Sequence, residues 1–250
     1  MKAYAKTDIG SKRSMNQDYM YCNTEPVGSF QNLLIVADGM GGHRAGDYAS
    51  RLCVETMVQS LEKSAHKTPV SLFEEAVTAA NKAVFEESAS HVEYEGMGTT
   101  VVACTLEENT LYIANIGDSR LYLIRDGIEQ ITDDHSLVEE MVKQGNITES
   151  EARIHPQKNI ITRALGINEE VQADFFEIDV EQGDVIMLCS DGLSNMIEDE
   201  DMEYIVKNSD TLQTAAESLV ARANENGGND NITVVIQCFN IYIFRRKKLW

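Results

Sequence analysis

Four runs of apolar residues in this chain each meet an aspartate at one end, and this pattern constrains the fold more than any other feature. A short, continuous apolar run is typical of a strand that is buried on both faces. A carboxylate at the end of such a strand loses water, which costs several kcal/mol unless a partner compensates. The runs and their acids are Leu33–Ala37 with Asp38, Leu111–Ile116 with Asp118, Val185–Cys189 with Asp191, and Ile232–Ile236 with Asp230. The fold must therefore supply partners for acids at several buried strand ends.

Two kinds of compensation are open to these acids. Asp–Gly is a favoured turn pair, so Asp38–Gly39 and Asp191–Gly192 each allow a purely structural interpretation. Basic partners are too few to serve generally, because 21 Lys+Arg face 41 Asp+Glu in the 250 residues. If the strand ends converge, divalent cations can neutralise them, and oxygen ligands without clustered Cys or His favour magnesium or manganese over zinc. Gly39 fits this second interpretation, because a carbonyl without a neighbouring side chain can approach an ion closely.

The acid excess also excludes classes of protein. A formal net charge of −20 is the opposite of the basic face that nucleic-acid binding usually needs. Hydrophobic residues make up 43% of the chain, which is not typical of a disordered protein. We find no secretory signal and no apolar run of the roughly 18 residues that a membrane helix needs. The sequence therefore predicts a soluble, cytoplasmic protein.

The positions of the cysteines are also typical of a cytoplasmic protein. Cys53, Cys104, Cys189 and Cys238 lie in apolar stretches, and none of the five cysteines forms a C-x-x-C pair. We therefore expect buried thiols in a reducing environment rather than disulfides or a zinc site.

Apolar periodicity divides the chain into helices and strands. Helices are expected at Gly46–Glu62, Val70–Ser88, Ser136–Gln144, Thr148–Arg153, Glu200–Asn208 and Leu212–Asn224. Strands are expected at Thr99–Leu106, Leu121–Ile124 and Phe175–Val180, besides the four acid-bearing runs. With three prolines and no Ser/Gly-rich tract there is no evident linker. The order of elements predicts an α+β fold in one domain, with an antiparallel sheet and helices packed outside it.

Six segments, taken in order, resemble the bacterial metal-dependent (PPM, type 2C) protein serine/threonine phosphatases. They are Arg13-x-x-Asn16-Gln17-Asp18, Asp38-Gly39-Met40-Gly41-Gly42-His43, Gly98-Thr99-Thr100, Asn115-Ile116-Gly117-Asp118-Ser119-Arg120, Ser190-Asp191-Gly192 and Gly228-Asn229-Asp230-Asn231-Ile232-Thr233. The resemblance implies a central antiparallel β-sandwich flanked by helix pairs, in four αββα layers, with a metal centre at one edge. It also implies a single phosphatase domain over residues 1–240, with a flap at about residues 139–166.

The resemblance implies a role for each acid. Asp38 would bridge two Mn²⁺ or Mg²⁺ ions, and the Gly39 carbonyl would bind one of them. Asp191 and Asp230 would complete the other ion, and Asp18 would lie on the Gly39 side.

Three further residues are carried over in the same way. Asp118 would hold a third, weaker ion that it shares with Asp191. Arg13 would grip the substrate phosphate, for which a guanidinium fork is suited. His43 would be the candidate general acid, with a helix-start histidine as the alternative. We interpret His135 as a turn residue and not as a metal ligand.

The implied reaction is hydrolysis of phosphoserine and phosphothreonine in proteins, by direct attack of a metal-bridging hydroxide and without a phospho-enzyme. The implied partners are phosphoproteins, including a membrane Ser/Thr kinase, and the protein is expected to be a monomer that binds no nucleic acid. Two alternatives stay open: a non-catalytic scaffold that binds phosphoproteins, and a two-metal phosphodiesterase.

Residues 241–250 combine apolar and basic side chains, ending in Arg245-Arg246-Lys247-Lys248-Leu249-Trp250. We expect a frayed extension of the last strand. Contact with an anionic membrane is the alternative.

Overall fold

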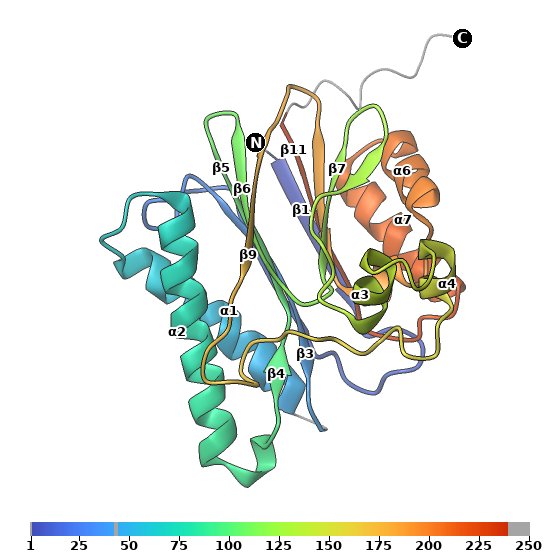
Figure 1. The fold of residues 1–250 in the computed structure, drawn as a ribbon. Coiled ribbons are helices and arrows are strands. Elements are labelled where there is room, and N and C mark those ends of the chain that lie inside the picture. Colours follow the sequence, from blue (N-terminus) through green and yellow to red (C-terminus); the bar gives the residue numbers. More distant parts are fainter. Residues whose placement is uncertain (1, 43–44, 240–250) are drawn as a thin grey trace, which may run out of the picture.

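Two antiparallel β-sheets lie face to face and are covered on both outer faces by helices. The computed structural model describes residues 2–42 and 45–239. Within these ranges, a five-stranded sheet has the order β1-β11-β10-β7-β8, and a six-stranded sheet has the order β2-β3-β5-β6-β9, with β4 paired to β3. Figure 1 shows α1 and α2 on one side of the two sheets and α6 and α7 on the other. The expected four-layer αββα sandwich is confirmed.

The strands are β1 (Lys2–Asp8), β2 (Asp18–Asn23), β3 (Leu33–Met40), β4 (Gly98–Thr99), β5 (Val101–Glu107), β6 (Thr110–Ile116), β7 (Arg120–Ile124), β8 (Ile128–Gln130), β9 (Asp174–Asp179), β10 (Val185–Cys189) and β11 (Ile232–Cys238). The helices are α1 (Ala45–Lys63), α2 (Pro69–Ser90), α3 (Leu137–Lys143), α4 (Glu149–Arg153), α5 (Asp191–Ser194), α6 (Asp199–Asn208) and α7 (Leu212–Glu225), with a 3₁₀ turn at Val92–Tyr94.

The central strands are apolar throughout because both of their faces are covered. Along β3, Leu33 and Ile35 pack toward α1 and α2, whereas Leu34 packs between the two sheets. Along β10, Met187 packs toward the α6–α7 layer, whereas Leu188 packs between the sheets. Successive side chains of a strand point to opposite faces, so each of these strands contributes to two of the three apolar layers.

The expected helices and strands are present, with ends shifted by at most three residues. The strand expected at Thr99–Leu106 is instead interrupted at Thr100, where β4 ends and β5 begins. Helix α4 begins with a capping box, in which the side chains of Thr148 and Glu151 each accept the other's backbone amide.

Strands β1, β2 and β8 and helix α5 have no counterpart among the expected elements. The first two are edge strands of their sheets and carry half-buried, mixed side chains, so their sequences lack a continuous apolar run. Helix α5 spans only four residues, which is too short for a helical period to be seen.

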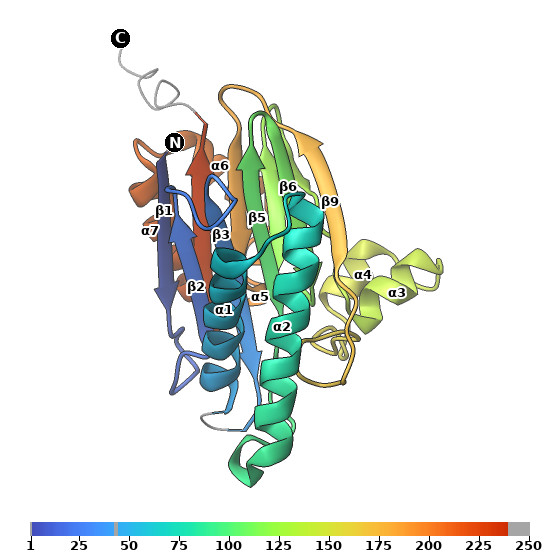
Figure 2. The same cartoon turned by 90° about the vertical axis from the view of Figure 1, so that its left-hand side faces the viewer.

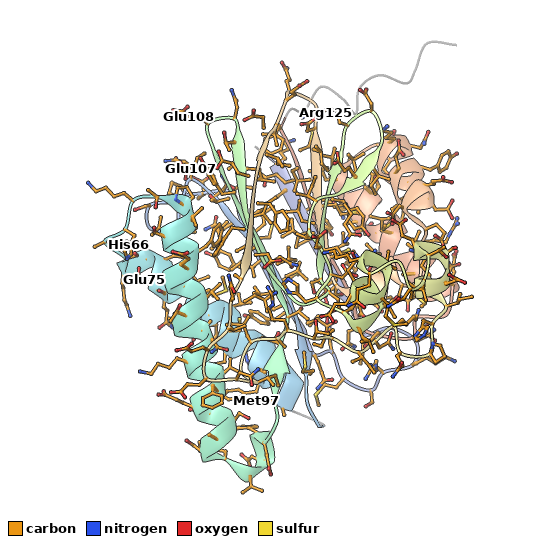
Figure 3. All side chains as sticks on the ribbon, in the orientation of Figure 1. His66, Glu75, Met97, Glu107, Glu108 and Arg125 are labelled. Atoms are coloured by element: carbon orange, nitrogen blue, oxygen red, sulfur yellow. The ribbon has the colours of Figure 1, made fainter. Side chains whose placement is uncertain are left out.

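The residues at the two ends of β5 show how this strand runs through the sandwich. Figure 3 shows Met97, which precedes β4, at the opposite end from Glu107 and Glu108 in the β5–β6 hairpin. Strand β5 therefore runs from the β4 end of the sandwich to this hairpin. Helices α3 and α4 stand beyond the β9 edge in Figure 2 and belong to the expected flap.

The four buried cysteines are found where they were expected. Cys53, Cys104, Cys189 and Cys238 are buried free thiols, and Cys22 is an exposed one. Burial raises the pKa of Cys53 and of Cys189 to about 12. None of the helices in the described ranges is long and apolar enough to span a membrane. The tail at 241–250 and His43 lie outside the described residues.

The layer between the sheets makes a testable prediction about stability. Leu188 is fully buried there, and Leu188→Ala should lower the free energy of unfolding by about 2–5 kcal/mol, because a cavity is left behind. Val92 is 90% exposed, and Val92→Ala should change it by less than about 0.5 kcal/mol. Urea denaturation measures both values, and equal losses would contradict the described packing.

Candidate metal centre

A cavity of about 260 Å³ gathers most of the predicted site residues. Its lining includes Arg13, Asp38, Gly39, Asp118, Asp191 and Asp230. These residues come from the β1–β2 loop, the end of β3, the β6–β7 turn, the start of α5 and the residues before β11. The acids at the ends of four apolar runs therefore converge on one place.

Asp18 and Asp38 are neighbours because of strand register. They are directly opposite each other in the antiparallel pair β2–β3. The Asp18 carboxylate accepts a hydrogen bond from Ser190 Oγ through Oδ2 at 2.7 Å. Its second oxygen, Oδ1, is buried and has no hydrogen-bond partner among the described residues.

Asp191 is the first residue of α5, directly after the buried strand β10. Asn195, one helical turn later, donates to Asp191 Oδ2 at 2.9 Å. The Oδ1 atom of Asp191 is also buried, and no described group donates to it. Each of these two acids therefore presents one unsatisfied oxygen.

Burial and the charges of neighbouring acids raise the pKa of four carboxylates of the site, those of Asp18, Asp38, Asp118 and Asp191. Burial, and then the neighbouring acids Asp191 and Asp230, raise the pKa of Asp18 to about 7. Burial, and then Asp230, raise the pKa of Asp191 to about 6. The pKa of Asp38 is well above its usual range because of burial and then Asp18, and that of Asp118 because of burial and then Asp191.

This donor set fits divalent cations. Buried anionic oxygens without hydrogen-bond donors need a positive partner, and carboxylates with a nearby backbone carbonyl are the ligands that Mg²⁺ and Mn²⁺ accept. In the described part of the chain, no three Asp, Glu, His or Cys side chains are already placed so that together they could hold a metal ion. Bound ions would relieve the mutual repulsion of these carboxylates.

Close backbone contact fixes the position of the Gly39 carbonyl. A Cβ added to Gly39 would lie 2.0 Å from the carbonyl oxygen of Gly46 in α1. A Cβ added to Gly46 would lie 2.7 Å from the Gly39 oxygen. The end of β3 and the start of α1 therefore approach each other as only two glycines allow.

Thr100 supports the same strand end. Its Oγ1 accepts the Asp38 amide at 3.0 Å, and its own amide donates to the Asp38 carbonyl at 2.9 Å. The Gly98-Thr99-Thr100 segment is uninformative by itself in the sequence, and the structure shows that it holds the backbone of Asp38 from the side of β4.

Arg13 lies at the rim of the cavity and is half exposed. Its Nη2 donates to Asp230 Oδ2 at 2.6 Å. The Gly228 carbonyl accepts the amides of Ser11 and Lys12, at 2.9 and 3.0 Å. The loop that carries Arg13 is thus bound to the loop that carries Asp230.

The segment expected to be a flap, at about residues 139–166, contributes Asn159 and Ile161 to the cavity lining, and the sequence did not single out either residue. Its Lys158 donates to Asn195 Oδ1 at 3.2 Å, and its Arg153 forms an ion pair with Glu198 at 3.0 Å. A second cavity of about 360 Å³ lies under α3 and α4 and shares Asp118 and Asp191 with the first.

The sandwich and its cavity define a protein suited to bind divalent cations at buried carboxylates, and comparison with known proteins names the family. The sequence model of the protein phosphatase 2C family matches residues 10–232 of this chain. The chain belongs to the protein phosphatase 2C family and is a protein phosphatase.

Individual relatives cover nearly the whole chain. The serine/threonine phosphatase stp of Listeria monocytogenes serotype 4b is 39% identical over 246 residues, covering 94% of this chain and 95% of that protein. The crystal structure of the Mycobacterium tuberculosis serine/threonine phosphatase PstP/Ppp has 36% identity and a TM-score of 0.85, covering 94% of this chain and 97% of that chain. A structure of the catalytic domain of PstP in complex with two manganese ions has 34% identity and a TM-score of 0.83, covering 94% of this chain and 96% of that chain.

The raised pKa of Asp18 predicts how the metal-free protein responds to pH. The folded pKa of about 7 lies above the ordinary value of 3.8, so the folded state binds this proton more tightly than the unfolded state. Its contribution to stability is present below about pH 4 and is lost as the pH rises through 7. Asp18→Asn should therefore stabilise the metal-free protein at pH 8, by on the order of a few kcal/mol, and much less at pH 4.

Urea denaturation in EDTA at both pH values measures this difference. The exposed Asp210→Asn is the matched control, because it removes a carboxylate away from the cavity. A stabilisation by Asp18→Asn that is equal at both pH values would refute the electrostatic explanation.

Proposed function

We propose that this phosphatase hydrolyses phosphoserine and phosphothreonine in proteins and that the carboxylate cavity is its metal-dependent active site. The observation that carries the proposal is the convergence of Asp38, Asp118, Asp191 and Asp230 with Arg13 in one cavity. The PstP relative that holds two manganese ions supports Mn²⁺ or Mg²⁺ as the cofactor.

Each acid has a proposed place in the centre. Asp38 would bridge two ions, with the Gly39 carbonyl and Asp18 on one side and Asp191 and Asp230 on the other. Asp18 and Asp191 are suited to bind a metal ion, since each has one buried oxygen to which no described group donates.

Asp118 would hold a third ion together with Asp191, because the two acids border the same second cavity. Bound divalent ions supply an acidified water as nucleophile and neutralise the phosphate oxygens.

Arg13 would orient the phosphate. Its guanidinium already faces the cavity and holds Asp230 with one nitrogen, which leaves further N–H donors for two phosphate oxygens. Its exposure at the rim allows a phosphorylated side chain to approach from solvent.

The leaving oxygen of serine or threonine needs a proton when the P–O ester bond breaks. We propose His43 as its donor, on the basis of its place in the Asp38–His43 segment alone, since His43 lies outside the described residues.

The wider setting is also a proposal. Free cysteines at all five positions fit a reducing, cytoplasmic compartment. We propose that residues 1–240 act as one phosphatase domain and as a monomer. A membrane Ser/Thr kinase of the same cell is the first phosphoprotein substrate to test.

Metal removal tests the proposed chemistry. Phosphate release from a phosphothreonine peptide should require Mn²⁺ and should stop in EDTA. Asp191→Asn should lower kcat by about 100-fold or more, because charge stabilisation by a bound ion is worth several kcal/mol. Asp210→Asn, on the surface, should leave the rate unchanged. Full turnover in EDTA would rule out the metal-dependent mechanism.

Arg13 gives a separate prediction about substrate binding. Arg13→Ala should lower kcat/KM by about 10- to 100-fold, because charge-assisted hydrogen bonds are worth about 1.5–3 kcal/mol. Arg13→Lys should recover only part of this loss, since an ammonium cannot bind two oxygens as a fork. Steady-state kinetics with the same peptide measures both variants, and Arg222→Ala on the outer helix α7 is the control. Unchanged kinetics in Arg13→Ala would remove Arg13 from the site.

A further inference from the structure

His135 is buried beside the turn that carries Asp118, and it is only 7% exposed. The Gly117 amide donates to its Nδ1 at 3.0 Å, and the His135 amide donates to the Gly117 carbonyl at 2.9 Å. Its Nε2 lies 3.0 Å from Asp174 Oδ2, at the start of β9. A residue that the sequence suggested was only part of a turn thus contacts the Asp118 turn through both its side chain and its backbone.

These contacts define the protonation of the ring. A backbone N–H can only donate, so Nδ1 of His135 must accept and carries no proton. The ring proton then lies on Nε2 and is donated to Asp174. His135 is therefore neutral, in the Nε2–H tautomer, because its second contact determines which nitrogen is free.

Asp174 is suited to hold this tautomer. Arg163 Nη1 donates to its other oxygen, Oδ1, at 2.6 Å. Burial raises the pKa of Asp174, but the hydrogen bonds from His135 and Arg163 outweigh this and lower it. An ionised carboxylate can only accept, so it cannot supply a proton to Nε2.

The Gly117 turn has little freedom of its own. Gly117 has a φ of +103°, and a Cβ added to it would lie 2.5 Å from Thr100 Cγ2. Thr100 and His135 therefore both contact the turn. Asp118 follows directly, so the Gly117–His135 contact sets where its carboxylate can lie.

His135 also binds the base of the flap. Its carbonyl accepts the Thr162 amide at 2.8 Å, next to Ile161 in the cavity lining and to Arg163 on Asp174. The Asp118 turn and the returning end of the flap are thus joined through one residue.

We propose that His135 is a positioning residue: its Nε2–H tautomer, held by Asp174, fixes the Gly117 amide and so aims Asp118 into the metal cavity. This inference rests on the proposed metal role of Asp118. His135 is not among the residues that line either cavity, and it acts through the backbone of Gly117.

The tautomer can be measured without metal or substrate. The full chain, labelled with ¹⁵N-histidine and kept metal-free, should show His135 as a neutral ring with its proton on Nε2 in ¹⁵N–¹H NMR spectra. Assignment comes from the signal lost in His135→Asn. A proton on Nδ1, or the averaged shifts of a freely exchanging ring, would overturn the proposal.

Two substitutions separate the two contacts of the ring. Asn places an acceptor where Nδ1 lies and keeps the Gly117 bond, whereas Gln places its amide near Nε2 and keeps only the Asp174 bond. His135→Gln should weaken the weakest Mn²⁺ site by about 10- to 100-fold, the usual effect of losing a group that orients a ligand. His135→Asn should weaken it by less than about threefold on the same scale.

Isothermal titration with Mn²⁺ measures these affinities, and phosphate release measures whether kcat falls with them at unchanged KM. The exposed His91→Asn is the matched control, and thermal melts check that each variant is folded. Equal affinities in folded Asn and Gln variants would overturn the role of His135 while leaving the proposed function intact. A lack of Mn²⁺ binding by the unsubstituted chain would overturn both.

Discussion

Repulsion among buried carboxylates at one edge of the β-sandwich is the constraint on which the rest of the structure depends. Burial raises the pKa of Asp38, and the charges of four neighbouring acids raise it further. They are Asp18, Asp191, Asp118 and Asp230. Such a cluster would separate if its backbone were free to move. It persists because two covered sheets fix the strand ends from which the acids project, and the helices on both outer faces bury enough apolar surface to hold those sheets together.

Hydrogen bonds around the cavity show how the fold holds these mutually repelling carboxylates in place. Hydroxyl and amide groups of Ser190, Asn195 and Thr100 hold the acids or their backbone in place. Ser190 and Asn195 each bind one oxygen of an acid, and the second oxygen of Asp18 and of Asp191 has no donor among the described residues. The close approach of Gly39 to Gly46 then brings a backbone carbonyl to the same place. The arrangement stores unsatisfied negative charge, and the chemistry that suits it is binding of hard divalent cations.

Much of this could be predicted from the sequence, because burial on both faces leaves a local mark. The runs before Asp38 and Asp191 were identified as strands since every residue in them is apolar. The half-polar β1 and the four-residue α5 were missed because neither leaves such a mark. In the site, acids next to apolar runs were recognisable. Asn159 and Ile161 were not, since a polar or apolar residue in a long loop looks ordinary until the loop is placed.

The sequence by itself determined which strands are buried, which acids lie at their ends and that basic residues are too few to neutralise those acids. All three depend on composition and on neighbours along the chain. Only the tertiary structure decided that Arg13 pairs with Asp230, 217 residues away, and that His135 joins the Asp118 turn to Asp174. Those pairings follow from strand register and from the path of the loops, which are set when two sheets pack and not by any local pattern.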